Sequence, residues 1–76
     1  MEEVKQLTQD AKVATIFKAD NGHYLVNFVD GELAVNAGYF YAEETAEAKC
    51  NELMNSGYVS ADMLKGDVPV EEPVVE

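Results

Sequence analysis

The side chains best suited to acid–base or nucleophilic chemistry stand apart from one another in this sequence. His23 is the only imidazole and Cys50 the only thiol. Both kinds of chemistry need a base or carboxylate within hydrogen-bond reach of the reacting group. The sequence places no such group at a catalytic spacing from either residue. We therefore predict a surface strand residue at His23, a packed core residue at Cys50, no catalytic residue and no enzyme activity.

The carboxylates are numerous but are not arranged as ligands. Neighbouring acids form three groups: Glu2/Glu3, Glu43/Glu44/Glu47 and Glu71/Glu72. A calcium loop alternates acids around a central glycine, and none of the groups has that pattern. The glycines are also dispersed and do not form a phosphate-binding loop. The sequence thus predicts no metal site and no cofactor.

Charge is the strongest functional signal. Fifteen Asp and Glu face five Lys and no Arg, which gives the 76 residues a formal charge of −10. Such a surface repels nucleic acid and anionic lipid and attracts basic surfaces. The absence of Arg removes the side chain best suited to bidentate hydrogen bonding with a phosphate. We expect a larger protein partner with a basic surface, no direct nucleic-acid binding and no membrane contact.

The chain ends differ in composition from its middle. Residues 67–76 read DVPVEEPVVE, and two prolines with four acids predict a disordered acidic tail. Residues 1–11 fit either a frayed helix, with Val4 and Leu7 on one side, or an unstructured lead-in. A single folded domain is therefore expected over residues 12–66.

Two features bear on location. No apolar run approaches the roughly 20 residues of a membrane span, and the N-terminus does not resemble a signal peptide. A lone cysteine precludes an intramolecular disulfide, which fits a reducing compartment. The sequence favours a cytoplasmic location.

Turn signals divide the middle of the chain into three strands. Asp20-Asn21-Gly22 and Asp30-Gly31 are typical of tight hairpin loops. A two-residue Asp30-Gly31 loop predicts an apolar face with these opposed pairs: Tyr24/Ala37, Val26/Val35 and Phe28/Leu33. Gly38, inside the third strand, indicates a bulge or a close backbone approach.

The register of the first hairpin has two solutions. A two-residue Asn21-Gly22 loop, our first expectation, directs one alternate set of side chains to the core: Val13, Thr15 and Phe17. A three-residue loop directs the other set to the core: Ala14 and Ile16. A slip of one residue exchanges the two faces of a strand.

Helical periodicity runs from residue 42 to 56. The predicted buried stripe follows i, i+4, i+7, i+8 spacing: Ala46, Cys50, Leu53 and Met54. The start lacks a capping side chain. At the end, Gly57 suits a left-handed C′ position with Tyr58 packed back on Leu53. A short capped turn near residues 60–66 is expected to lay Met63 and Leu64 over the core edge.

These elements predict an α+β fold. Its expected form is a three-stranded antiparallel β-meander with one α-helix packed on one face (β-β-β-α), a short C-terminal helical turn and the disordered tail. Three strands and a packed helix meet the usual minimum for independent stability. The other face of the sheet is left open.

The candidate partner-binding residues lie near the strand-to-helix junction and on the open face. Alternation through Tyr39-Phe40-Tyr41 sends the tyrosines inward and Phe40 outward as an interface anchor. The first helical turns carry acids where the helix dipole favours them. The predicted contact set is Glu43, Glu44, Glu47, Phe40 and Leu25.

Two functions fit these observations. The first is a small acidic protein-binding module that occludes or regulates a basic surface of a larger partner. Small acidic single-domain chains resemble in type the phage-encoded inhibitors of host nucleic-acid-handling enzymes, viral proteins that include nucleic-acid mimics. The alternative is a non-enzymatic assembly subunit that uses its open sheet face or an edge strand, a homodimer included. Strong salt dependence of binding would favour the first.

Overall fold

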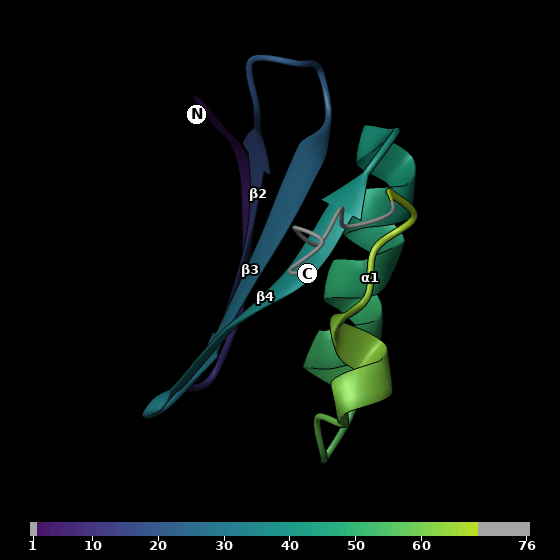
Figure 1. Ribbon diagram of the computed structural model, residues 1–76. Helices are drawn as coiled ribbons and strands as arrows, with labels where there is room; N and C mark the ends of the chain where they lie inside the picture. The colour runs from purple at the N-terminus through teal and green to yellow at the C-terminus, as the bar shows by residue number, and fades with distance from the viewer. Residues whose placement is uncertain (1, 69–76) are drawn as a thin grey trace, which may run out of the picture.

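The computed structural model describes residues 2–68, which form a four-stranded antiparallel sheet with one helix across one face (Figure 1). The elements are β1 (Glu2–Gln9), β2 (Lys12–Lys18), β3 (Tyr24–Asp30), β4 (Leu33–Phe40), α1 (Glu43–Asn55) and a 3-10 turn, η1 (Ala61–Leu64). Each strand pairs with the next in sequence. The α+β class and the meander are confirmed, but the sheet has four strands and not three. The tail expected at 67–76 lies outside the described residues apart from Asp67 and Val68.

The additional strand is the segment expected to be a frayed helix or a lead-in. β1 pairs antiparallel with β2, with Leu7 opposite Ala14 and Gln6 opposite Thr15. Leu7 is the one half-buried side chain of β1, and its seven other residues are exposed. An edge strand with so little burial shows almost no hydrophobic alternation. Backbone pairing with β2 forms it, and that pairing leaves little trace in the sequence.

The first hairpin has the three-residue loop. The Ala19 N–H donates to the His23 carbonyl at 2.8 Å, the Gly22 N–H donates to the Ala19 carbonyl at 3.0 Å, and Gly22 has φ +88°. This is a turn closed by a left-handed glycine. Ala14 and Ile16 are fully buried as a result. The two-residue expectation was wrong, and the three-residue alternative is confirmed.

The second hairpin turns one residue later than expected. Asp30 lies opposite Leu33 and Phe28 opposite Val35, so the loop is Gly31-Glu32, with Gly31 at φ +62°. The register therefore differs from the expected one by two residues. A shift of two preserves the faces, and Phe28 remains in the core.

A bulge in β4 reverses the orientation of the aromatic run. Between the pairs Asn27–Asn36 and Leu25–Tyr39, β4 contains one residue more than β3, and Gly38 has φ +94°. An extra residue exchanges the faces of the strand beyond it. Phe40 consequently turns into the core and is 2% exposed, whereas Tyr41 is 59% exposed. The expected alternation through this run was wrong.

The same glycine allows the chain to pass close to the edge of β4. A side chain at Gly38 would meet the Gly66 backbone nitrogen and, at 2.8 Å, its Cα atom. The Val68 N–H donates to the Tyr39 carbonyl at 3.0 Å. Both expectations for Gly38, the bulge and the close approach, are confirmed. Residues 65–68 therefore run beside the outer edge of β4.

The core lies between the sheet and α1. The predicted helix stripe is buried in full: Ala46, Cys50, Leu53 and Met54. It packs against side chains from three strands: Ala14, Ile16, Val26, Phe28, Ala37 and Phe40. Met63 and Leu64 pack at its edge, as predicted. In Figure 1, α1 covers one side of the sheet, and no described element covers the other.

The ends of α1 differ in how their backbone groups are satisfied. Ala42 precedes the helix without a side-chain cap, as predicted. The expected glycine cap at the C-terminus was wrong, because Gly57 does not adopt a positive φ and Tyr58 is 76% exposed. Instead, Lys12 Nζ donates to the carbonyls of Met54 at 3.1 Å and Ser56 at 3.0 Å. A cation from β2 thus caps the negative end of the helix dipole.

Candidate functional site

Two of the five predicted contact residues are not at the surface. Phe40 is 2% exposed because the bulge turns it toward α1. Leu25 does lie on the face opposite α1, but it is 8% exposed because it lies between Phe17 and Tyr39 on the neighbouring strands. Neither side chain offers the exposed anchor that we expected.

The three acids of the predicted set separate into a pair and a bridge. Glu43 and Glu44 are exposed in the first turn of α1. Glu47 is half-buried, and its Oε2 lies 3.0 Å from Lys5 Nζ, which links α1 to β1. Within residues 2–68 no lysine forms an ion pair with Glu43 or Glu44. The predicted acidic site is thus reduced to these two carboxylates.

Four of the five lysines contact carboxylates or helix carbonyls within the molecule, and Lys18 is exposed. Lys49 and Lys65 form ion pairs one turn away, with Glu52 at 2.7 Å and Asp62 at 3.8 Å. Lys5 and Lys12 contact α1 as described, and Lys18 Nζ lies 6.0 Å from the centre of the Tyr24 ring. Little positive charge is therefore left to face a partner.

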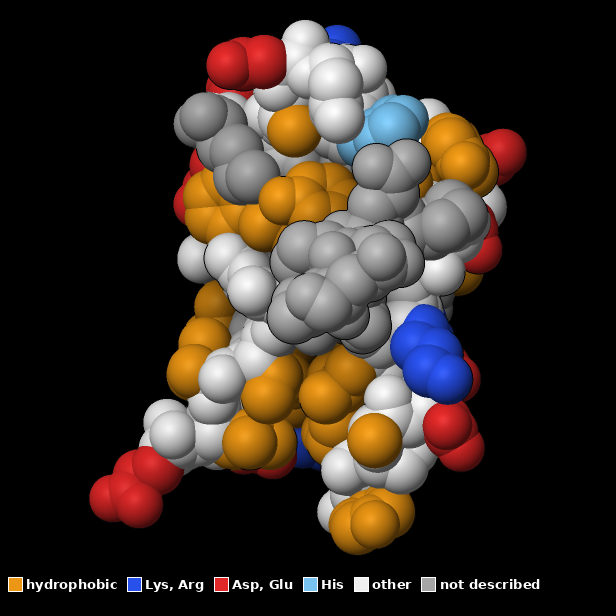
Figure 2. Space-filling model, viewed as in Figure 1, with side chains coloured by type: hydrophobic (Ala, Val, Ile, Leu, Met, Phe, Trp, Pro, Cys, Tyr) orange, Lys and Arg blue, Asp and Glu red, His pale blue; other side chains and the backbone are white. Residues whose placement is uncertain are grey.

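Most of the acids, in contrast, point outward. Eight exposed carboxylates have no lysine partner in the described part of the chain: Glu2, Glu3, Asp10, Asp20, Glu32, Glu43, Glu44 and Asp67. In Figure 2 acidic side chains stand at the top, at the lower left and along the right side of the view. The negative charge is therefore spread over several parts of the surface and does not form one compact patch.

The two side chains with nucleophilic or acid–base potential lie apart. His23 is half-buried in the first hairpin loop, just before β3, with its ring edge-on to Tyr41 at a centroid distance of 5.2 Å. Cys50 is fully buried on α1. Burial, and secondarily the nearby Glu47, raises the pKa of the Cys50 thiol from 9.0 to about 11. The prediction that Cys50 is a core residue is confirmed.

We expect Cys50 to react with a thiol reagent only when the protein opens. At about pH 8, where a free thiol is partly ionised, the folded protein should react far more slowly than the protein in denaturant. Because folding disfavours the thiolate, its contribution to stability is complete below pH 9.0 and is lost as pH rises through about 11. The absorbance released by the thiol reagent, with Cys50→Ser as blank, measures the reaction rate, and urea titrations of both proteins between about pH 8 and 11 measure the effect on stability. Rapid reaction of the folded protein would contradict the prediction.

The face of the sheet opposite α1 carries three rows of side chains that run across all four strands. One row is Glu3, Phe17, Leu25 and Tyr39, the middle row is Gln6, Thr15, Asn27 and Asn36, and the third is Thr8, Val13, Val29 and Ala34. We call these twelve residues the open face. Glu3, at its edge, is its one charged member. An open face with Leu25 on it was expected, but the members on β1 and β2 were not, because β1 was not recognised as a strand and the first expected register of β2 was wrong.

The part of the open face formed by β3 and β4 is hollowed and contains an unsatisfied polar atom. Asn27 and Asn36 line a depression of about 240 Å³, together with Val29 and Ala34. The Oδ1 atom of Asn27 is buried and accepts no hydrogen bond from any residue between 2 and 68. Beside it, Gln6 Nε2 donates to Thr15 Oγ1 at 3.4 Å. A buried acceptor without a donor is rare in folded proteins.

Comparison of the chain with family models, with curated proteins and with solved structures found no match. Within residues 2–68, His, Cys, Asp and Glu side chains do not gather in groups of three or more that could hold a metal ion. None of the helices in that range has the length and apolar character needed to cross a membrane. The distribution of charge and the open face are therefore the two features of this protein that point to a function.

Proposed function

We propose that this protein is a small acidic binding module that occludes or regulates a basic surface of a larger protein. One observation supports the proposal above others. Four of the five lysines contact carboxylates or helix carbonyls of the same chain, and eight exposed carboxylates have no lysine partner within residues 2–68. A molecule with this distribution presents negative charge at both ends of the sheet and at the start of α1, where a basic surface can approach it.

The proposed mechanism is electrostatic attraction followed by occlusion. Exposed charges act over about 8 Å at physiological ionic strength, so they chiefly accelerate encounter with a basic partner. The basic groove of a nucleic-acid-handling enzyme is a suitable target, since it is built to attract phosphates. A bound acidic protein would exclude nucleic acid from that groove, which is the action of a phage-type inhibitor. The module needs no catalytic group for this role.

Glu43 and Glu44 are the carboxylates that we assign to the contact. Their conversion to Gln, Glu43→Gln with Glu44→Gln, should lower the association rate about threefold to tenfold in dilute buffer and much less at high salt. Both side chains are exposed and form no ion pair with a described lysine, so the fold should be retained. Affinity capture from the source cell at low salt, then surface plasmon resonance on the isolated partner, gives the rates.

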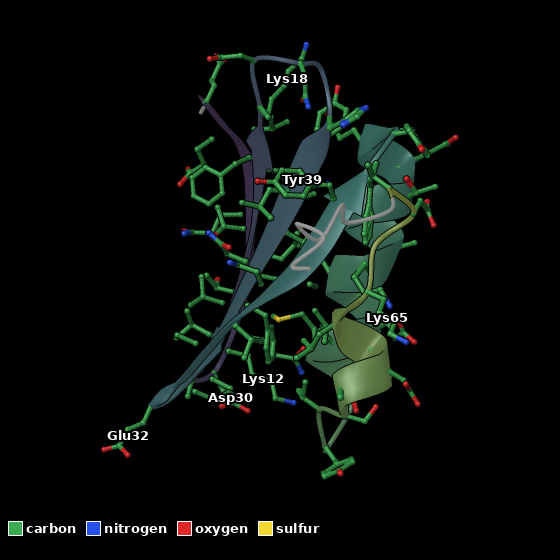
Figure 3. All side chains as sticks on the ribbon, viewed as in Figure 1. Lys12, Lys18, Asp30, Glu32, Tyr39 and Lys65 are labelled. Carbon is green, nitrogen blue, oxygen red and sulfur yellow. The ribbon has the colours of Figure 1, made fainter. Side chains whose placement is uncertain are left out.

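A matched control separates a local contact from total charge. Asp10→Asn with Glu32→Gln removes the same two charges from the hairpin turns at the far end of the sheet, where Gly31 N–H donates to the Ala11 carbonyl at 3.5 Å. Figure 3 shows Glu32 at that end, away from the start of α1. If association is equally slow in both double variants, charge acts without a preferred site. If it is indifferent to salt and to both, the proposal is wrong.

A further inference from the structure

We propose that the open face is a self-association surface on which a second copy of this chain packs, sheet against sheet. This inference goes beyond the acidic contact proposed above and concerns the opposite side of the sheet from α1. It rests on the charge, area and hydrogen-bonding needs of the twelve residues in the three rows.

The open face is nearly free of charge in a chain of net charge −10. Glu3 lies at the outer end of one row, on the edge strand, and the other eleven members are uncharged. Depletion of charge is the composition that marks the centre of a protein interface. A basic partner would find nothing to pair with here. A second copy, in contrast, would bring an equally uncharged surface.

Apolar side chains supply the packing surface in the two outer rows. Phe17 and Tyr39 flank Leu25 in one, and Val13, Val29 and Ala34 form most of the other. Tyr39 projects away from α1 (Figure 3). Val29 is 37% exposed, which is a large exposure for a valine on a central strand of the sheet. Two such faces pack about 10 Å apart in aligned β-sandwiches.

The area is sufficient for a reversible dimer. Strands lie about 4.8 Å apart and residues about 3.3 Å apart along a strand. Four strands of seven or eight residues, taken at the shorter length, therefore give the whole sheet a footprint of roughly 19 by 23 Å, or about 900 Å² for two copies. Side-chain relief increases the accessible area that is buried, which brings the contact to about 1,000 Å², the lower limit of specific interfaces.

The unsatisfied amide of Asn27 fits a two-fold contact. Dimers with two-fold symmetry place the same surface patch on both sides, so residues near the axis meet their own counterparts. An Asn side chain carries both an acceptor and a donor, which makes it self-complementary. A two-fold axis through the middle row would let the Asn27 Oδ1 of one copy accept from an amide N–H of the other, from Asn27 or Asn36. The depression beside Asn27 leaves room for that group.

Charge outside the contact gives the dimer a distinctive salt dependence. Each copy has a net charge of −10, so two copies repel one another. The residues at the centre of the open face are uncharged, so they add nothing to that repulsion. Added salt screens that repulsion. Self-association should therefore strengthen with salt, the opposite of the acidic contact with a basic partner. The two proposals can then fail independently.

Sedimentation equilibrium of the full chain tests the inference. Measurements from about 10 µM to about 1 mM cover the range in which contacts of this size associate. We expect the dimer fraction to rise with concentration and to rise again at about 0.5 M NaCl, where the screening length is about 4 Å. Val29→Glu and, independently, Asn36→Asp should each weaken dimerisation at least tenfold. Tyr58→Glu adds the same charge at an exposed site outside the open face and should change it less than twofold.

Each other outcome overturns the inference. If the protein is a monomer at every concentration and salt, the inference is wrong. If Val29→Glu then also loses the partner captured from the source cell, the open face binds that other protein. A dimer that salt weakens depends on ion pairs and not on this face. A dimer indifferent to both Val29→Glu and Asn36→Asp uses another surface. Circular dichroism melts of the variants confirm that each measurement was made on folded protein.

Discussion

Val26→Asp is expected to leave the protein unfolded at room temperature. Val26 is fully buried between Ile16 on β2 and the helix stripe of α1. A carboxylate there would lie in the apolar core with no cation among the buried residues around it, which costs several kcal/mol even after its pKa adjusts. The total stability of a chain of this length is roughly 4–11 kcal/mol. Far-UV circular dichroism and a urea titration should show loss of the cooperative transition.

The matched control is Ala34→Asp, which introduces the same charge on the other face of the sheet. Ala34 is exposed and lies opposite Val29 in β3. Its replacement should change the free energy of unfolding by less than about 1 kcal/mol. A similar loss of stability in both variants, or a larger loss at Ala34, would mean that the faces of the sheet have been assigned incorrectly.

The helix was the most predictable element because its signal is local. A stripe with spacing i, i+4, i+7, i+8 identifies one face without reference to any other segment. All four members, Ala46, Cys50, Leu53 and Met54, are buried. The C-terminal cap was not predictable, because Lys12 lies more than 40 residues away in sequence from the carbonyls it contacts. Gly57, next to the end of the helix, suggested a glycine cap that the structure does not have.

Three of the four strands, β2, β3 and β4, were predictable in location but not in register. Both hairpin loops fall within or beside the recognised turn residues, yet each loop differs from the first expectation by one or two residues. Turn residues such as Gly22 and Gly31 accept several loop lengths, and the side-chain pattern must choose among them. In β2, Val13, Thr15 and Phe17 make as plausible a buried set as Ala14 and Ile16. Packing against α1, a non-local contact, decides between them.

The errors in register and strand number also led to errors in the predicted contact residues. Phe40 was assigned outward by simple alternation, and the one-residue bulge at Gly38 reversed it. Glu43 and Glu44 needed no register, and they are exposed as expected. Glu47 was indistinguishable from them by sequence because its partner, Lys5, belongs to a strand that the hydrophobic pattern does not reveal. An open face was expected, but its members on β1 and β2 were not, because β1 was omitted and the register of β2 was wrong.

The close approach of two glycines leads to the second large expected effect. Gly38→Ala should lower the free energy of unfolding by about 3 kcal/mol, for two reasons. A residue with a side chain is strained at the backbone angle of φ +94° that Gly38 adopts. Its Cβ would also meet backbone atoms of Gly66, with the Cα atom at 2.8 Å. Backbone cannot rotate away as a side chain can. Relief requires either that residues 65–68 leave the edge of β4 or that the bulge be lost, which would turn Phe40 out of the core. A urea titration measures the loss.

Two further glycine variants separate strain from collision. Gly66 lacks a positive φ, so Gly66→Ala removes only the close approach, in which its Cβ would lie 2.6 Å from the Tyr39 nitrogen. It should cost less than Gly38→Ala and should speed exchange of the Val68 amide proton, which donates to the Tyr39 carbonyl. Gly57→Ala meets no atom within 4 Å and should change stability by less than about 0.5 kcal/mol. If all three variants have equal stability, the bulge does not need glycine, and the orientation of Phe40 depends on core packing alone. If Gly38→Ala alone is destabilised, the strain lies in its φ and residues 65–68 are free to move.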